Sequence, residues 1–452
     1  MKIIVCGSGA VAKSVISYLV KGANDIIVVD DNQRRLDELS KEFDILPITG
    51  TPSHPDVLEH AGAKDTDIIL ALTSSDEMNM IICQLAYSLF DIRKKIAAVN
   101  SETFLDPLWG MLYNDNHLPI DLLISPDIDI AEHILKILQY PGATGVLPIW
   151  QGKYSIITLN LGAEIPFSDM PLGQIIKQPG ASSLGVVNIV RDNVSFLPDM
   201  YETLHPADQI NLLVKTEEIY SVISAFGLEK PTNERIVLFG GTPIAQYLCQ
   251  RLEADDSITS TRLIEADIDK AKVLARRLNR TVVINGEMMS DVILSEAEIA
   301  KADTAIAVTD NDKDNLLASL LASHDGVGST IAVINTPSYN NLMFNISDNT
   351  LVERSAITIS RLLKEIRRSN IENAYSIARS QGEIWDIALN ENNCCVGKKN
   401  GELGLSKNSR IIAVLRGGEI IYPDMNTKLE AGDRLLIYVD SAAIKKAEEI
   451  FC

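Results

Sequence analysis

The two halves of this 452-residue chain carry the same segments in the same order. TDIILALTSSDEMN (66–79) reappears 236 positions later as ADTAIAVTDNDKDN (302–315), and the glycine turn GSGAVA after MKIIVC reappears as GGTPIA after RIVLF. The segment beginning VVNIVRDNVSFLPDM at Val186 reappears as IIAVLRGGEIIYPDM at Ile411. Agreement over so many ordered segments predicts a duplicated two-domain unit, A-B-A′-B′.

Each A unit alternates short apolar strands with amphipathic helical patterns, and both faces of the strands are apolar. This pattern is typical of a parallel sheet covered by helices on both sides. The B units are smaller and mix strands with one helix and a hairpin. The fold class is therefore α/β, with two Rossmann-like doubly wound parallel-sheet domains, each followed by a small α+β domain. In the first copy we expect strands at 3–6, 26–30, 45–49, 68–72, 96–99, 154–161, 186–191 and 210–215, and helices at 11–19, 80–89 and 172–177.

The duplication and the composition of the junctions divide the chain into four domains. The expected boundaries are 1–140 and 230–368 for the two nucleotide-binding domains, and 141–229 and 369–452 for the two α+β domains.

The first glycine turn has the properties of a dinucleotide site. Gly7 allows the tight turn after the strand, and Gly9 lets backbone N–H groups approach a pyrophosphate at the helix N-terminus. Asp30 ends the next strand, where an acid binds the ribose. Asp31 follows it in place of a cation, which favours NAD(H) or an adenine nucleotide over NADP. A nucleotide fold that binds nothing remains the alternative.

The second turn is poorer in the features that hold a phosphate. Thr242 replaces the close-approach glycine, and Pro243 removes an N–H group, while Glu265 still supplies the ribose acid. We therefore expect the first site to bind more strongly than the second.

Hydroxyl residues follow the fourth strand of both copies. Thr73 and Ser74, with Thr309 and Asp310 in the second copy, are expected at the rim of the crevice, where they can bond a ribose. Capping of the next helix by Thr73 and Thr309 is the alternative. Asp76 and Glu77 fall in the first turn of that helix, where a negative charge is favourable in itself.

Composition and motifs argue against several function classes. A net charge of −20 disfavours nucleic acid and anionic lipid as partners, since both attract Lys and Arg. No apolar run reaches the ~18 residues of a spanning helix, and the N-terminus lacks the zones of a signal peptide, so we expect a cytoplasmic protein. The six cysteines have no metal spacing, and the six histidines have no counterparts between the repeats. We expect no metal and no enzyme activity; an NAD-dependent oxidoreductase is the alternative.

The A units resemble the regulator-of-potassium-conductance domain (RCK, also called KTN), and the B units resemble its C-terminal companion. The motifs are GSGAVA with DIIVVDD, the stretch TGTPSHPDVLEHAGAKDTDIILALTSSDEMNM, and QYPGA at 139–143. The resemblance implies a regulatory subunit, peripheral on the inner face of the cell membrane, that forms a ring, expected to be a tetramer. It would dock on a Trk-type potassium-translocating membrane subunit, acting on potassium indirectly, with NAD(H) or ATP/ADP as regulatory ligands.

The family's nucleotide positions carry over to two sets of residues. They are Gly7, Ser8, Gly9, Ala10, Val11, Asp30, Thr73 and Ser74 in the first copy, and Gly240, Gly241, Thr242, Pro243, Ile244, Glu265, Thr309 and Asp310 in the second. Members of the family often have an Arg after the fifth strand, where this chain has Ala98 and Val333. This departure predicts an altered nucleotide preference. A regulator of another ion transporter built on the same domains remains an alternative.

Overall fold

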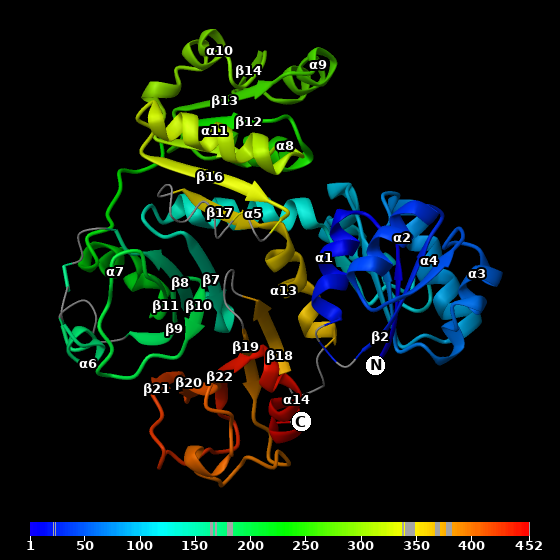
Figure 1. Cartoon of the computed structure of the whole chain (residues 1–452), viewed down its shortest axis with the longest axis vertical. Helices are drawn as coiled ribbons and strands as arrows, with labels where there is room; N and C mark the ends of the chain where they lie inside the picture. The colour runs from blue at the N-terminus through cyan, green and yellow to red at the C-terminus, as the bar shows by residue number, and fades with distance from the viewer. Residues whose placement is uncertain are drawn as a thin grey trace. The chain divides into compact units, whose positions relative to one another are not determined.

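The computed structural model describes residues 1–20, 22, 24–162, 166–167, 170–178, 184–336, 339, 349–366, 371–376 and 382–451. The chain forms two compact units, Met1–Asp129 with Arg354–Arg368, and Ile130–Glu353 with Ser369–Cys452 (Figure 1).

The first unit contains a six-stranded, all-parallel sheet of strand order β3-β2-β1-β4-β5-β6. Its central strands are buried on both faces: Ile3 and Val5 pack on one side, and Ile4 and Cys6 on the other. The expected doubly wound sheet is confirmed, and β6 is an additional strand. The elements are β1 (Lys2–Cys6), α1 (Ala10–Leu19), β2 (Asp25–Asp30), α2 (Gln33–Glu42), β3 (Leu46–Thr49), α3 (Pro55–His60), β4 (Ile68–Ala71), α4 (Asp76–Phe90), β5 (Lys94–Ala98) and β6 (Leu122–Ile124).

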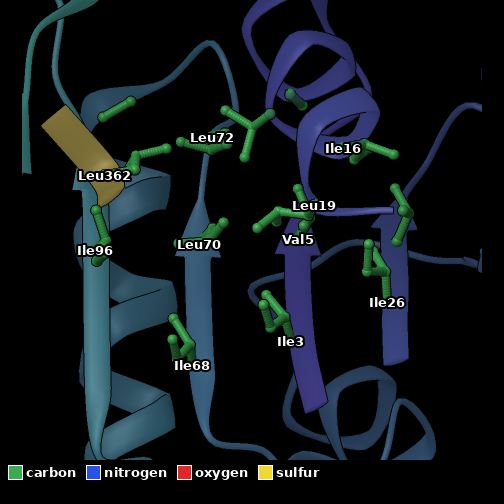
Figure 2. Packing of buried hydrophobic residues seen from close by; sticks show 14 of the residues in the cluster. Ile3, Val5, Ile16, Leu19, Ile26, Ile68, Leu70, Leu72, Ile96 and Leu362 are labelled. Atoms are coloured by element: carbon green, nitrogen blue, oxygen red, sulfur yellow. The ribbon is translucent and has the colours of Figure 1, made fainter. Parts of the chain in front are cut away.

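A helix from the end of the second repeat completes this unit. In α13 (Arg354–Ile366), Leu362 and Ile366 join the core cluster formed by β1, β4 and α1, as Figure 2 shows for Leu362. Arg354 Nη1 donates to Asp127 Oδ1 at 2.6 Å, which ties the start of α13 to the first turn of α5 (Pro126–Gln139). The first sheet therefore depends on residues more than 220 positions downstream of its last strand.

The second unit repeats the parallel sheet with the order β14-β13-β12-β15-β16-β17. Here α5, from the first repeat, packs on the second sheet's domain: Tyr247 Oη donates to Glu132 at 2.7 Å, and Asn233 Nδ2 donates to Leu138 O at 2.7 Å. The two repeats thus exchange their last helices. The elements are β12 (Arg235–Phe239), α8 (Pro243–Glu253), β13 (Ser260–Glu265), α9 (Ile268–Arg277), β14 (Val282–Asn285), α10 (Asp291–Glu296), β15 (Thr304–Ala307), α11 (Asp312–His324), β16 (Ser329–Ile334) and β17 (Thr350–Glu353).

Two antiparallel five-stranded sheets complete the second unit, with matching orders β10-β9-β11-β8-β7 and β21-β20-β22-β19-β18. Their hairpins turn at Asp192-Asn193 and Gly417-Gly418, all with positive φ, which confirms the expected hairpins. The elements are β7 (Gly145–Ile149), β8 (Tyr154–Asn160), α6 (Leu172–Ile175), β9 (Gly185–Arg191), β10 (Val194–Phe196), β11 (Gln209–Lys215), α7 (Ile219–Ala225), β18 (Ile371–Ser376), β19 (Gly382–Ala388), β20 (Arg410–Arg416), β21 (Glu419–Ile421), β22 (Arg434–Asp440) and α14 (Ile444–Phe451). The short 3₁₀ turns are η1 (Ala63–Asp65), η2 (Glu102–Leu105), η3 (Pro107–Leu112), η4 (Trp150–Gly152), η5 (Thr216–Glu218), η6 (Ile299–Lys301), η7 (Asn400–Glu402) and η8 (Ser441–Ala443).

The two α+β domains share a core within this unit. Trp150 and Tyr154 of the first pack with Ile384 and Tyr438 of the second, and the Trp150 indole donates to the buried Asp386 carboxylate at 3.0 Å. Burial of one domain's aromatic side chains by the other joins the pair.

Candidate functional site

The register of the parallel strands brings the predicted residues of the first copy to one edge of the sheet. Cys6 of β1 lies beside Val29 of β2 and Ala71 of β4, so the residues that follow these strands meet at their carboxyl ends. This edge is where ligands bind in doubly wound folds.

Gly7 makes the turn that opens this edge. Its φ is +112°, and a Cβ there would lie 2.6 Å from Leu72 O, so only glycine fits between the ends of β1 and β4. Its N–H donates to Val29 O at 2.8 Å, which fixes the turn on β2.

The next residues leave polar groups available. Ser8 is 8% exposed, and its Oγ has no hydrogen-bond partner among the described residues. Gly9 is the N-cap of α1 with no side chain to cap the helix, and a Cβ there would meet nothing within 4 Å. Ala10 and Val11 form the first turn of α1, whose N–H groups have no carbonyl partner inside the helix. The turn therefore presents a buried hydroxyl and helix N–H groups beside open space.

Asp30 and the end of β4 complete the first edge. Asp30 Oδ1 accepts the N–H of Asn32 at 2.8 Å, and no other described residue hydrogen-bonds this carboxylate. Thr73 donates its hydroxyl to Asn79 Oδ1 at 2.7 Å, while Ser74 is exposed at the rim.

The sequence offered the alternative that Thr73 and Thr309 cap the helices that follow them, and the structure contradicts it. Ser75 is the N-cap of α4 and Asn311 that of α11, so Thr73 and Thr309 do not cap these helices. Each threonine instead donates its hydroxyl to a buried asparagine in the first turn of the following helix, Asn79 of α4 or Asn315 of α11. Asp310 follows Thr309 as an exposed residue at the equivalent rim.

The second copy has the same register, with Phe239 beside Ile264 and Ala307. Its glycine turn, however, is already hydrogen-bonded to a side chain of the same domain. Gly240 has φ +95° like Gly7. Glu265, 9% exposed, accepts the Gly241 N–H at 2.6 Å through Oε2 and the Asp267 N–H at 2.7 Å through Oε1.

The N-terminus of α8 is occupied as well. The Thr242 hydroxyl donates to Val308 O at 2.8 Å and caps the Ala245 N–H, Pro243 has no N–H to offer, and Ile244 is fully buried. The groups that are open in the first turn are engaged in the second.

Two positioning residues escaped the sequence prediction. Asn79, fully buried, accepts the Thr73 N–H at 2.9 Å and donates to Ala98 O at 2.8 Å, which locks the ends of β4 and β5 to α4. Asn315 repeats this arrangement with Thr309 and Val333 O. The one sequence signal for their role was that both repeats carry an asparagine at the same place, in the segments DEMN and DKDN.

A carboxylate at the start of α4 holds the next loop. Asp76 accepts the Asn100 N–H and Nδ2 at 2.9 Å and the Ser101 N–H at 3.0 Å. Asp312 makes the matching set with Asn335 and Thr336. Asp76 thus links the rim of the candidate site to the segment after β5 rather than only balancing the helix dipole.

Ala98 and Val333, which stand where members of the family often have an arginine, have structural roles. Ala98 and Val333 are buried at the ends of β5 and β16, and their carbonyls accept the amides of Asn79 and Asn315. Neither position directs a cation to the edge of its sheet.

We also searched the described ranges for metal sites, membrane-spanning helices and unusual titratable groups. Within them no three His, Cys, Asp or Glu residues gather as a metal site, and no helix is both long and apolar enough to span a bilayer. Burial lowers the pKa of His133 to about 4 and raises that of Cys83 to about 12, so both are neutral near pH 7.

Comparison with known proteins shows which domain models and which relatives the chain matches. The TrkA-N domain model matches residues 3–117 and 236–352, and the TrkA-C domain model matches residues 386–451. The chain is 31% identical to the Trk system potassium uptake protein TrkA of Azorhizobium caulinodans and 30% identical to that of Halomonas elongata, in each case over 100% of this chain and 98% of the relative.

Solved structures share the fold at low identity. The GsuK RCK domain superposes with a TM-score of 0.63 at 19% identity, covering 99% of this chain and 94% of that chain. A GsuK channel bound to NAD superposes with a TM-score of 0.62 at 20% identity, covering 99% and 78%. The duplicated domains, the matched models and the full-length relatives together show that the chain belongs to the TrkA family of Trk system potassium uptake proteins.

Proposed function

We propose that this chain is the cytoplasmic, nucleotide-sensing regulatory subunit of a Trk-type potassium uptake system. The observation that carries the proposal is the first glycine turn, where a buried, unpartnered Ser8 hydroxyl lies beside the open Gly9. A buried hydroxyl without a partner costs free energy unless a ligand or water satisfies it.

The chemistry of this edge fits a nucleotide that carries a diphosphate. The N-terminus of α1 and the Ser8 hydroxyl would donate to phosphate oxygens, and the Asp30 carboxylate would accept from the ribose hydroxyls. The full set proposed for the first site is Gly7 to Val11, Asp30, Thr73 and Ser74. NAD(H), ATP and ADP are the proposed ligands, supported by the folds described as GsuK bound to NAD and to ADP.

We propose that the second site, Gly240 to Ile244 with Glu265, Thr309 and Asp310, binds more weakly. A ligand phosphate would have to displace the Glu265 carboxylate from the Gly241 N–H, and it would gain no N–H from Pro243. The two repeats would then have different roles: the first would bind the regulatory nucleotide, and the second would serve mainly as a structural domain.

Regulation would act through a population shift. A ligand at the first turn changes the state of the assembly only through its different affinity for the two states, with ~1–3 kcal/mol typical of such coupling. Asp76 and Asn79 connect the rim to the loop after β5, so closure around a nucleotide would be transmitted to that loop. The proposed assembly is a ring of copies, expected to be a tetramer, that docks on the membrane subunit.

Binding measurements on the full chain test the proposal. Calorimetry with NADH, NAD, ATP, ADP and NADP should detect binding of at least one of the first four, and Ser8→Ala and Asp30→Ala should each weaken it. If none of these nucleotides binds the wild-type chain, the sensor function fails. If bound NADH exchanges hydride with a substrate, the oxidoreductase alternative replaces it.

A further inference from the structure

A cavity of about 340 Å³ lies in the second unit, where the first α+β domain meets the β20–β21 hairpin of the second. Its walls are the start of β8, the end of β11 with η5, and Glu419 of β21. The Lys153 ammonium donates to Gly418 O at 2.5 Å, which holds the hairpin against this end of the first domain. The volume falls at the small end of the range of ligand pockets, so the cavity suits a small molecule.

A buried tyrosine lines this cavity with its hydroxyl unpartnered. Tyr154 is 2% exposed, and its ring packs in the core that the two α+β domains share. Its hydroxyl makes no hydrogen bond within the described part of the chain. Burial raises the pKa of this phenol; the Lys215 cation partly offsets the rise, and nearby glutamates, Glu419 among them, add to it. A buried phenol hydroxyl normally has a partner, so this one is available to a ligand.

Charges of both signs surround the cavity without pairing with one another. They belong to two lysines and two glutamates, Lys153, Lys215, Glu217 and Glu419. Within the described ranges none of these four side chains forms an ion pair. Lys215 lies directly opposite Tyr154 in the antiparallel pair of β11 and β8, so both side chains leave the sheet on the same face. The cavity therefore keeps opposite charges apart, and their sum is zero.

The second repeat does not carry this set of residues. The α+β domains match at an offset of 225 along the last long strand, and Gly382 pairs with Asp440 as Tyr154 pairs with Lys215. The positions that match Lys215, Glu217 and Tyr154 hold Asp440, Ala442 and Gly382. The second domain folds without these groups, so the architecture alone does not require them in the first.

We infer that this cavity binds a small zwitterion of the α-amino acid class. Lys215 and the Tyr154 hydroxyl would donate to the ligand carboxylate, and Glu217 and Glu419 would accept from its ammonium group. A simple anion would lie against two carboxylates and a simple cation against two lysines, so a neutral ligand with separated charges has the better complementarity. Because Lys215 and Glu419 belong to different α+β domains, the bound ligand would bridge them.

Calorimetry on the full chain tests the inference. The neutral L-amino acids, titrated singly on a millimolar scale, should include at least one that binds. That amino acid should bind about tenfold or more tightly than its amide, which lacks the carboxylate, and than the matching carboxylic acid without the amino group. If no neutral L-amino acid binds, or if either singly charged analogue binds as tightly, the inference is overturned.

Three variants assign the binding to this cavity. Tyr154→Phe keeps the buried ring and removes only the hydroxyl, and it should weaken binding about threefold to tenfold. Lys215→Met should weaken it about tenfold or more, since it removes a charged donor. Glu217→Gln/Glu419→Gln should abolish the preference for the amino acid over the carboxylic acid without the amino group. Tyr154→Phe remains informative if Lys215→Met lowers stability.

Matched controls change exposed charges elsewhere on the same two domains. Lys177→Met and Glu391→Gln should bind the amino acid as the wild type does. Asp30→Ala should also keep full amino-acid affinity; its loss would place the ligand at the first glycine turn and overturn the inference. Equal affinity in the wild type, Tyr154→Phe and Lys215→Met would overturn it as well and leave the proposed function standing. Failure of every nucleotide to bind would overturn the proposed function and leave this inference standing.

Discussion

The Glu265 carboxylate accepts a hydrogen bond from the backbone N–H of Gly241 at 2.6 Å, while the matching Asp30 makes no bond to the first glycine turn. Glutamate is one methylene longer than aspartate, and this extra length lets the second repeat occupy its own turn. The difference between the repeats is thus a matter of side-chain reach as much as of glycine content.

Shortening this side chain should open the second turn. In an Asp30→Ala background, which removes the ribose acid of the first site, Glu265→Asp should raise the residual affinity for the bound nucleotide about tenfold, equivalent to ~1.4 kcal/mol. Titration calorimetry measures the change. Glu298→Asp, at another carboxylate of the same domain, is the control. Unchanged affinity in the Glu265→Asp chain would mean that the carboxylate does not limit the second site.

Two glycines of the first turn should respond differently to alanine. Gly7→Ala forces a residue with a Cβ into φ +112° and against Leu72 O, so it should destabilise the first unit by about 1–3 kcal/mol. Gly9→Ala has open space and should cost less than about 1 kcal/mol, yet its methyl would occupy the space of the pyrophosphate and weaken nucleotide binding. Urea unfolding and calorimetry separate the two effects, and full nucleotide affinity in Gly9→Ala would contradict the assignment.

Replacing the buried Asn79 or Asn315 should lower the stability of the chain by similar amounts but should affect nucleotide binding differently. Asn79→Ala leaves the Thr73 N–H and Ala98 O without their partner, which should lower the free energy of unfolding by about 2–4 kcal/mol. Asn315→Ala should cost a similar amount in the second copy. Only Asn79→Ala should weaken nucleotide binding, and an equal loss of affinity in both variants would argue against a dominant first site.

A buried carboxylate should make stability depend on pH. Glu383 is 2% exposed, and burial raises the pKa of its carboxyl to about 8, against the hydrogen bond from Trp385 Nε1, which lowers it. The folded chain therefore holds a proton that the unfolded chain releases near its ordinary pKa, so this group's contribution to stability falls as pH rises from about 5 to 8.

Glu383→Gln removes this dependence. The variant should gain stability relative to the wild type between pH 6 and 8, with the difference levelling off above pH 8, as followed by thermal unfolding across pH. A difference that stays constant with pH would show that the Glu383 carboxyl does not titrate in this range.

The sheets and their carboxyl edges could be predicted because local pattern decides them. The β-branched run IIVV (26–29) of β2 is buried on both faces, and the turn after β1 requires glycine at Gly7 whatever the rest of the chain does. The position of the candidate site follows from these two facts alone, since parallel strands end at a common edge.

The remaining features depend on contacts that no local pattern specifies. The amphipathic pattern of α13 predicts an apolar face but not that Leu362 belongs to the core of the first repeat. The acid at Glu265 is visible in the sequence, but its bond to Gly241 is a choice of side-chain conformation. The role of Asn79 needs two strand ends, those of β4 and β5, in their final positions before its amide has partners.

The helix exchange also sets an order of events during synthesis. Leu362 and Ile366 help to cover the face of the first sheet on which α1 packs, yet that sheet's last strand ends at Ile124. A ribosome adding about 5–20 residues per second would need more than ten seconds between the two. Throughout that interval the nascent first domain would expose an unfinished apolar face, so its native fold becomes available only when the second sheet has already been translated.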